Sequence, residues 1–381
     1  MLQPLANAQT MSAFKKLGFL SIYLMILLSN GVFILTHGQF TWTGVLFAYG
    51  VVPLVDALMG KDKNNAAKED FERLMNDRFF DSVVYSLVYV HLIQLGLAVF
   101  AILTYEMTLF QWIGYVLSLG IFAGTMINVA HELGHRSSKT AQFHAKLTLM
   151  TVCYMHFFIE HNRGHHVWVA TPHDPATARK GQSLYAFWWQ SVTGSFRSAL
   201  AIERRLLEKA NVSFWSIRNN MIWAVLLPLL FCGLLTALGS WKAGRLAWEV
   251  IPFFFGQSLV AILLLESVNY IEHYGIVRRE IAPGKYERVN PLHSWNANHL
   301  FSNLVLFQLQ RHSDHHAYAS RPYQVLRHFD ESPQLPFGYP LMILMASVPP
   351  LWFSVMDRRL EHWRGYAYDS QHIAQVVREM A

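Results

Sequence analysis

The sequence predicts an all-α integral membrane protein with six transmembrane helices and a cytoplasmic, histidine-rich helical domain. Hydrophobic residue types make up 53% of the 381 residues and charged types only 15%, whereas a soluble domain has about 25% charged residues. The 19 histidines are unusually numerous, and many of them are clustered. Two cysteines are too few for a disulfide scaffold. The chain also lacks the polar, low-complexity sequence of a disordered protein.

Six apolar stretches are long enough to cross a membrane. A helix needs roughly 20 apolar residues to cross a hydrocarbon core of about 30 Å, because lipid offers no partner for unpaired backbone groups. The first stretch is longer than the hydrophobic region of a usual cleaved signal, and no A-x-A-like cleavage site follows it. The predicted spans are residues 17–36, 40–59, 79–103, 109–130, 221–238 and 250–270.

The positive charges predict which side each segment faces. Nearly all of the 31 Lys and Arg residues lie in alternate segments, and the positive-inside rule makes those segments cytoplasmic. Both termini are therefore predicted inside, and this placement of charge argues against a nucleic-acid partner. Two further apolar stretches, 145–159 and 338–355, are predicted to be buried against the cytoplasmic domain or to lie at the interface.

The predicted organisation has four parts. Residues 1–130 hold the N-terminal tail and transmembrane helices 1–4, and residues 131–218 form a cytoplasmic segment with the first two histidine motifs. Residues 219–274 hold transmembrane helices 5–6, and residues 275–381 form a C-terminal cytoplasmic segment with the last histidine motif.

Four histidine motifs fall at the predicted cytoplasmic side: HELGHR, EHNRGHH, NYIEHYG and QRHSDHH. Residues three or four apart share one face of a helix, so each motif with several histidines can aim two or three imidazoles at one point. Adjacent histidines such as His165 and His166 diverge by about 100° on a helix, so each can reach a different metal. Neutral imidazole is a good ligand for transition metals. Nine such nitrogens exceed what one ion accepts, so the sequence predicts two metals held by His131, His135, His161, His165, His166, His273, His312, His315 and His316.

The second nitrogen of each metal-bound imidazole needs a hydrogen-bond acceptor. Acidic residues next to or near the motifs are predicted to supply it: Glu132, Glu160, Asp174, Glu272 and Asp314. Four other histidines are candidates for outer or spare ligands, namely His173, His293, His299 and His328, and the remaining histidines are expected to be structural.

In this order around six spans, the four motifs resemble the membrane-bound alkane 1-monooxygenase family, a branch of the superfamily that includes integral-membrane fatty-acid desaturases. The resemblance implies a non-haem site with two Fe ions, held by these nine histidines only, and O₂ as co-substrate. It implies terminal hydroxylation of medium-chain n-alkanes to 1-alkanols in a bacterial inner membrane, during hydrocarbon degradation. Electrons would come from a rubredoxin and its reductase. The segment TPHDPATARKG also resembles the family and supports outer roles for His173 and Asp174.

An alkane has no hydrogen-bonding group, so its binding must come from apolar burial, about 0.8 kcal/mol per methylene. We expect a narrow channel between the second, third, fourth and sixth spans that presents only the chain end to the metals. Its candidate lining residues could equally be helix packing or lipid contacts; they are Tyr49, Val52, Leu58, Ile127 and Leu265.

Two cysteines cannot form a rubredoxin domain, which needs four, so a separate donor must dock on the cytoplasmic face. Basic residues that could receive an acidic donor are Arg136, Arg163, Arg204, Arg205, Arg278 and Arg279. They could equally follow the positive-inside rule and meet anionic lipid.

Other functions remain open at this point. The second motif has one residue more than the HxxHH of desaturases, and a desaturase or a hydroxylase of aromatic methyl groups shares much of the pattern. HELGH also matches the zinc-protease signature, with Glu132 as general base, but such a protease leaves seven clustered histidines unexplained. A metal transporter would place its ligands at mid-membrane depth instead of the inner interface.

Overall fold

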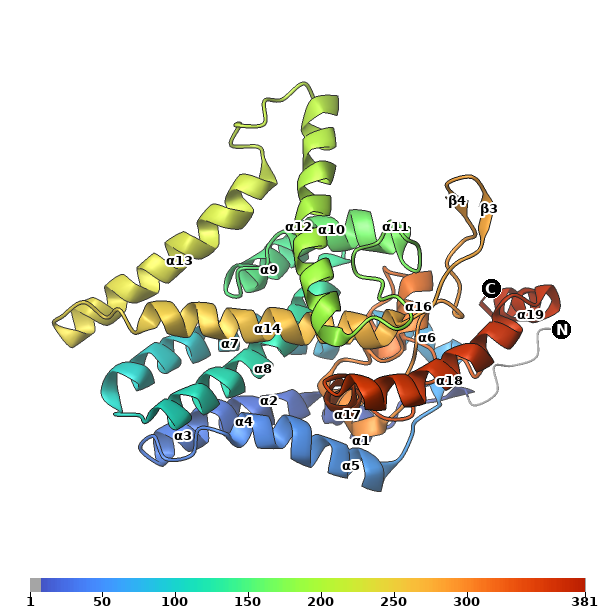
Figure 1. The fold of residues 1–381 in the computed structure, drawn as a ribbon. Helices are drawn as coiled ribbons and strands as arrows, with labels where there is room; N and C mark the ends of the chain where they lie inside the picture. Colours follow the sequence, from blue (N-terminus) through green and yellow to red (C-terminus); the bar gives the residue numbers. More distant parts are fainter. Residues whose placement is uncertain (1–7, 381) are drawn as a thin grey trace.

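The computed structural model describes residues 8–380 and is almost entirely helical (Figure 1). Residues 1–7 of the predicted N-terminal tail lie outside the described part. Two small strand pairs are present: β1 (Ala8–Gln9) runs parallel to β2 (Asn65–Ala66), and β3 (Glu280–Ala282) runs antiparallel to β4 (Lys285–Tyr286). The predicted all-α class is confirmed.

Five helices in the described residues are long and apolar enough to cross a membrane, which makes this a multi-pass membrane protein. They are the run α1–α3 (Ala13–Leu35), α7 (Arg78–Thr104), α8 (Leu109–Gly134), α13 (Asn220–Ala243) and α14 (Val250–His273). The second predicted span is shorter than expected, because it is helical only over Thr43–Met59. A sixth long candidate is the pair α17 (Tyr339–Ala346) and α18 (Pro349–Ala367), which is bent by 119°.

The first two apolar helices are built from short α, 3-10 and π segments. The first contains α1 (Ala13–Gly18), η1 (Phe19–Ser21), α2 (Ile22–Ile26), η2 (Leu27–Gly31) and α3 (Val32–Leu35), and the second contains α4 (Thr43–Leu46), η3 (Phe47–Val51) and α5 (Val52–Met59). The remaining elements are α6 (Lys68–Met75), α9 (Lys139–Met150), α10 (Phe157–Glu160), η4 (His161–His165), α11 (His166–Trp168), α12 (Leu184–Lys209), α15 (Leu300–Val305), α16 (His312–Ala317), η5 (Tyr323–Val325) and α19 (Ser370–Met380).

Helix α8 is the buried centre of the bundle, because 89% of its most apolar 18-residue stretch is buried inside the protein. It packs closely on α14 through two glycines four residues apart: a Cβ on Gly120 would collide with Val260, and one on Gly124 would lie 2.7 Å from Cδ2 of Leu264. Small residues at this spacing let membrane helices approach closely. The contact brings the ends of α8 and α14, which carry the first and third histidine motifs, to one end of the bundle.

The long helices α7, α8 and α14 run in similar directions, whereas α12 crosses them and α13 slopes away (Figure 1). The stretch 145–159 forms the end of α9, a turn and most of α10, and much of it is buried. The stretch 338–355 forms α17, which packs against α14, and the start of α18. Neither stretch is a straight span.

Candidate metal centre

Nine histidines converge at one end of the bundle and form two clusters. In each cluster, one ring nitrogen of every histidine lies within 4.8 Å of the others. The five-histidine cluster consists of His131, His135, His161, His166 and His315, and the four-histidine cluster consists of His165, His273, His312 and His316.

The five-histidine cluster joins three parts of the chain through their Nε2 atoms. The end of α8 supplies His131 and His135, one helical turn apart, and α16 supplies His315. The Nε2 atoms of His131 and His315 are 2.9 Å apart. The Nε2 atom of His161 lies 3.0 Å from that of His135 and 3.0 Å from that of His166.

The four-histidine cluster is built in the same way and is buried throughout. His273 ends α14, and His312 and His316 share a face of α16 at i, i+4. Their Nε2 atoms are close: His312 to His316 is 2.9 Å and His273 to His312 is 3.1 Å. His165 completes the group, with its Nε2 atom 3.2 Å from that of His316.

The second and fourth motifs are each divided between the clusters, which agrees with the prediction that adjacent histidines such as His165 and His166 reach different metals. The chain from His161 to His165 is a π-helical turn, which widens the helix by one residue. His161 therefore shares a cluster with His166, five residues on, and His165 faces the other cluster. In α16, His315 is likewise directed away from His312 and His316.

This donor set fits two transition-metal ions. Burial lowers the pKa of His161, His166 and His315 well below the usual value, so these rings are neutral at pH 7. A neutral imidazole has one N–H donor and one lone pair. Several Nε2 atoms about 3 Å apart cannot all be satisfied by hydrogen bonds to one another, but a cation accepts all their lone pairs.

Asp174 lies beside His165, in the position that an outer hydrogen-bond acceptor would take. Nδ1 of His165 lies 2.9 Å from Oδ2 of Asp174, which also accepts a hydrogen bond of 2.6 Å from the Thr177 hydroxyl. Burial opposes a charge on His165, but the neighbouring Asp174 carboxylate raises the pKa of His165 above its usual value. The carboxylate therefore leaves Nε2 of His165 free to face the four-histidine cluster.

Replacing Asp174 with Asn should weaken metal binding in the four-histidine cluster by about 10–100-fold, because the partner that orients a metal-bound imidazole is lost. Competition with a metal-binding dye, measured on the purified chain in detergent, gives the affinity. Thr177→Val is the control: it removes one hydrogen bond to the carboxylate but keeps the contact with His165, so its effect should be much smaller. Unchanged affinity in Asp174→Asn would exclude this role.

Two other predicted carboxylates lie beside the clusters. Oε2 of Glu272 is 3.2 Å from Nε2 of His312, and its Oε1 accepts a 2.7 Å hydrogen bond from the Tyr339 hydroxyl. An outer acceptor would face the Nδ1 atom of His312. Glu272 instead faces the Nε2 atom, which is the nitrogen that lies in the cluster. Glu160 is buried, and burial together with nearby Asp174 raises its pKa to about 8.

Three predicted outer groups have other partners. Glu132 pairs with Arg136 at 3.1 Å. Asp314 pairs with Arg321 and Arg327, because a residue two positions after His312 lies on the opposite side of the helix. His173 is exposed, and its ring packs on Trp168 instead of facing a metal cluster.

The other three histidines that the sequence left open also lie outside the clusters. Nε2 of His293 lies 3.3 Å from Glu287, and Nε2 of His328 lies 3.1 Å from Asp330. His299 precedes α15 as its N-cap residue. These three histidines therefore contact other parts of the protein and do not face either cluster.

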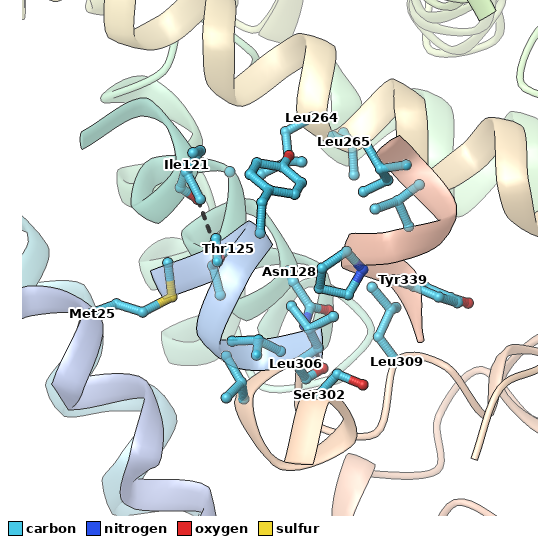
Figure 2. A pocket seen from close by; sticks show the side chains of 18 residues that line it. Met25, Ile121, Thr125, Asn128, Leu264, Leu265, Ser302, Leu306, Leu309 and Tyr339 are labelled. Atoms are coloured by element: carbon cyan, nitrogen blue, oxygen red, sulfur yellow. Dashed lines mark hydrogen bonds between the residues drawn. The ribbon is translucent and has the colours of Figure 1, made fainter. Parts of the chain in front are cut away.

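An apolar cavity of about 70 Å³ lies between α8, α14, α17 and the segments around η3 and α15 (Figure 2). Tyr49, Val52 and Leu265 from the predicted channel line it. Ile127 is fully buried but is not among the lining residues, and Leu58 is 78% exposed on the outside of α5. Three of the five predicted channel residues thus line the cavity.

Several lining residues are close in sequence to the histidines. Asn128 precedes His131 by one helical turn, Leu309 precedes His312 by three residues, and Tyr339 bonds to Glu272. The cavity therefore approaches both clusters. Asn128, Leu309 and Tyr339 were not predicted from the sequence, although the spacing from His131 indicates Asn128.

Comparison with known proteins agrees with this geometry. Residues 108–346 match the fatty acid desaturase family. An alkane 1-monooxygenase from Pseudomonas putida is 43% identical over 315 residues, which cover 83% of this chain and 77% of that protein. The chain belongs to the alkane 1-monooxygenase family.

Other relatives bear on the alternatives that the sequence left open. Alkane 1-monooxygenase 2 from Alcanivorax borkumensis is 39% identical over 98% of this chain and 97% of its own length. The hydroxylase component of a xylene/toluene monooxygenase from Pseudomonas putida is only 27% identical, over 90% of this chain and 88% of its own. Both the predicted membership of the alkane 1-monooxygenase family and the enzyme class are confirmed.

Proposed function

We propose that this protein hydroxylates the terminal carbon of medium-chain n-alkanes to 1-alkanols, with O₂ as co-substrate and iron in both histidine clusters. The observation that supports the proposal best is an apolar cavity whose lining residues Asn128 and Leu309 each lie three residues before a clustered histidine, His131 and His312. Bound iron would supply the oxygen activation that breaks an unactivated C–H bond. The alkane 1-monooxygenases at about 40% identity favour this chemistry over desaturation.

The protein's part in the reaction is to hold the metals and to present the chain end. The nine histidines are the proposed ligands, and Asp174 fixes the ring of His165. Leu265, Leu306 and Leu309 offer an alkane only apolar contact, worth about 0.8 kcal/mol per buried methylene. A narrow cavity that admits the chain lengthwise would bring the terminal carbon to the clusters first.

The proposed reaction can be tested by identifying the products. The purified chain, loaded with Fe(II), is supplied with a reduced rubredoxin, O₂ and n-alkanes of graded length, and the products are separated by gas chromatography. We expect 1-alkanols. Alkenes as the main product would indicate a desaturase, and oxidation of toluene in preference to any alkane would indicate the aromatic-methyl alternative.

Ile121 should limit the length of alkane that fits. The cavity follows α8 from Asn128 to Ile121 (Figure 2), and Ile121 lies ten residues before His131, roughly 15 Å along the helix. Ile121→Ala should favour longer alkanes, and each newly buried methylene should raise kcat/KM about fourfold. Competition between alkanes of different length measures the shift.

Ile127→Ala is the matched control, because Ile127 is an equally buried isoleucine of α8 that does not line the cavity. It should leave the chain-length profile in place. The same profile in Ile121→Ala and in the wild-type protein would contradict the proposed path.

The electron donor is proposed to be a rubredoxin that docks at the histidine-rich end, with both termini in the cytoplasm of a bacterial inner membrane. Arg163 and Arg205 are exposed, and the side chain of Arg204 is 71% exposed. Arg136 and Arg279 are half-buried in ion pairs with Asp81 and Glu287. Arg278 is buried and donates to the carbonyl oxygen of Val167, so it cannot be a docking residue.

Docking by surface charge should make electron transfer depend on salt. The rate from reduced rubredoxin should fall several-fold between 50 and 300 mM salt if the exposed arginines steer an acidic donor, because screening weakens such steering. Stopped-flow reoxidation of the rubredoxin measures this rate. A rate that salt does not change would leave anionic lipid as the partner of these arginines.

A further inference from the structure

A polar hollow of about 480 Å³ opens beside the five-histidine cluster, and one of its lining residues, Arg163, is among the arginines proposed to receive the electron donor. It is lined by Gly134, His135, Arg136, Ser137, Gln142, Phe158, Asn162, Arg163 and Ser320. These residues come from the end of α8, the turn after it, α9, α10, η4 and the chain after α16. His135 alone among the nine clustered histidines lines this hollow.

The two clusters differ in their access to solvent. His135 and His166 of the five-histidine cluster are half-buried. In the four-histidine cluster, His273 has no exposed surface, His165 is 1% exposed and His312 is 2% exposed. Release of an ion from the four-histidine cluster to solvent therefore requires local opening of the surrounding structure.

The apolar cavity is unsuitable for a hydrated ion. Moving a charge into apolar surroundings costs many kcal/mol unless polar groups replace its water. The hollow offers such groups: Ser137, Gln142, Asn162 and Ser320 line it. Two arginines also line the hollow. The charge of Arg136 is balanced by Asp81 at 2.5 Å and Glu132 at 3.1 Å, which reduces the repulsion of a cation at that wall. The exposed Arg163, in contrast, keeps a positive charge on another part of the lining.

The walls of the hollow are held in place by local hydrogen bonds. Nε2 of Gln142 donates to the carbonyl oxygen of Arg136 at 3.0 Å, and Nδ2 of Asn162 donates to that of Phe158 at 2.8 Å. The opening is therefore part of the folded structure and does not depend on a rearrangement of these side chains.

We infer that this hollow is the route by which a divalent transition-metal ion exchanges between solution and the five-histidine cluster, while the four-histidine cluster retains its ion. The inference rests on the proposed two-metal site. It assigns different roles to the two openings: the apolar cavity admits the alkane, and the polar hollow admits hydrated ions.

The test measures metal release from the full-length chain in detergent. The protein is loaded with Fe(II) without oxygen and mixed with excess EDTA, an anionic chelator, and its metal content is followed by mass spectrometry after rapid desalting. We expect two phases of one equivalent each, the first at least about tenfold faster, since only the second requires local opening. Diethyl pyrocarbonate should label the side chains of His135 and His166 during the first phase, and those of His273 and His312 only during the second, with each labelled residue located by fragmentation of its peptide.

Ser320 and Ser137 are exposed residues that line the hollow and come from distant parts of the chain. Ser320→Trp and Ser137→Trp therefore each place a large side chain at its mouth. Each should slow the first phase several-fold and leave the second unchanged. Ser354→Trp is the control, because Ser354 is an exposed serine on α18 that does not line the hollow. Two mouth variants keep the test valid if one of them fails to fold.

The possible results are distinguishable. Loss of both metals at one rate, or a first phase that neither mouth variant slows, would overturn the inference and leave the proposed function standing. A starting content below two metals in the loaded protein would contradict the two-metal proposal, and the inference with it.

Discussion

His273→Gln should reduce the metal content from two ions to about one per chain and lower alkane hydroxylation at least about 100-fold. Loss of a group that only supports a ligand typically costs 10–100-fold, and His273 is itself one of four proposed ligands. Its ring has no exposed surface, and its Nε2 atom lies 3.1 Å from that of His312. The glutamine amide is of similar size but is a poor substitute for an imidazole nitrogen.

Metal analysis and product formation on the same sample measure both effects. His328→Gln is the matched control: His328 is also buried, but it pairs with Asp330 and belongs to neither cluster. It should retain two metals and most of the activity. Wild-type metal content and activity in His273→Gln would show that the four-histidine cluster is not a metal site.

Asp314→Ala should destabilise the protein by about 3–5 kcal/mol, the cost of removing one partner from a buried ion pair. The Asp314 side chain has no exposed surface, and Arg321 and Arg327 lie 2.6 and 3.0 Å from its oxygens. Without the carboxylate, both guanidinium groups lose their shared acceptor. Asp314 lies between His312 and His315 in α16, so the loss should also displace three ligands and lower metal retention in both clusters.

Thermal unfolding in detergent measures the effect, and we expect the midpoint to fall on the order of 10 °C. Glu208→Ala is the comparison, because Glu208 and its partner Arg204 are both more than half exposed. An exposed pair contributes only about 0–1 kcal/mol, so that variant should unfold close to the wild type. Equal midpoints for the two variants would contradict a stabilising role for the ion pairs of Asp314 with Arg321 and Arg327.

The sequence was enough to identify the nine histidines that meet, because their motifs lie at or beyond the ends of apolar helices. Helix geometry also predicted that neighbours such as His165 and His166 reach different metals, but it did not assign the other histidines to the two clusters. That division depends on the π-helical turn from His161 to His165, which changes the residues that share a face and has no signature in hydrophobic pattern. The two partners of Asp314 were also hidden, since Arg321 and Arg327 come from a loop.

The substrate cavity was the least predictable part of the site. A continuously apolar helix has no polar stripe to show which face is buried, so the sequence could not separate Val52, which lines the cavity, from Leu58, which is exposed. Ile127 and Asn128 are neighbours, but only Asn128 lines the cavity. The helix rotation that decides this is fixed by packing, for example of Gly120 and Gly124 against α14.

The most direct test of a two-metal alkane hydroxylase is the metal content of the purified full-length chain, measured by mass spectrometry against protein concentration from amino-acid analysis. We predict two irons per chain, one in each histidine cluster. If zinc replaces iron during expression, reconstitution of the stripped protein with Fe(II) should still give two. A chain that binds one metal, and gains no second under Fe(II) reconstitution, would contradict the account.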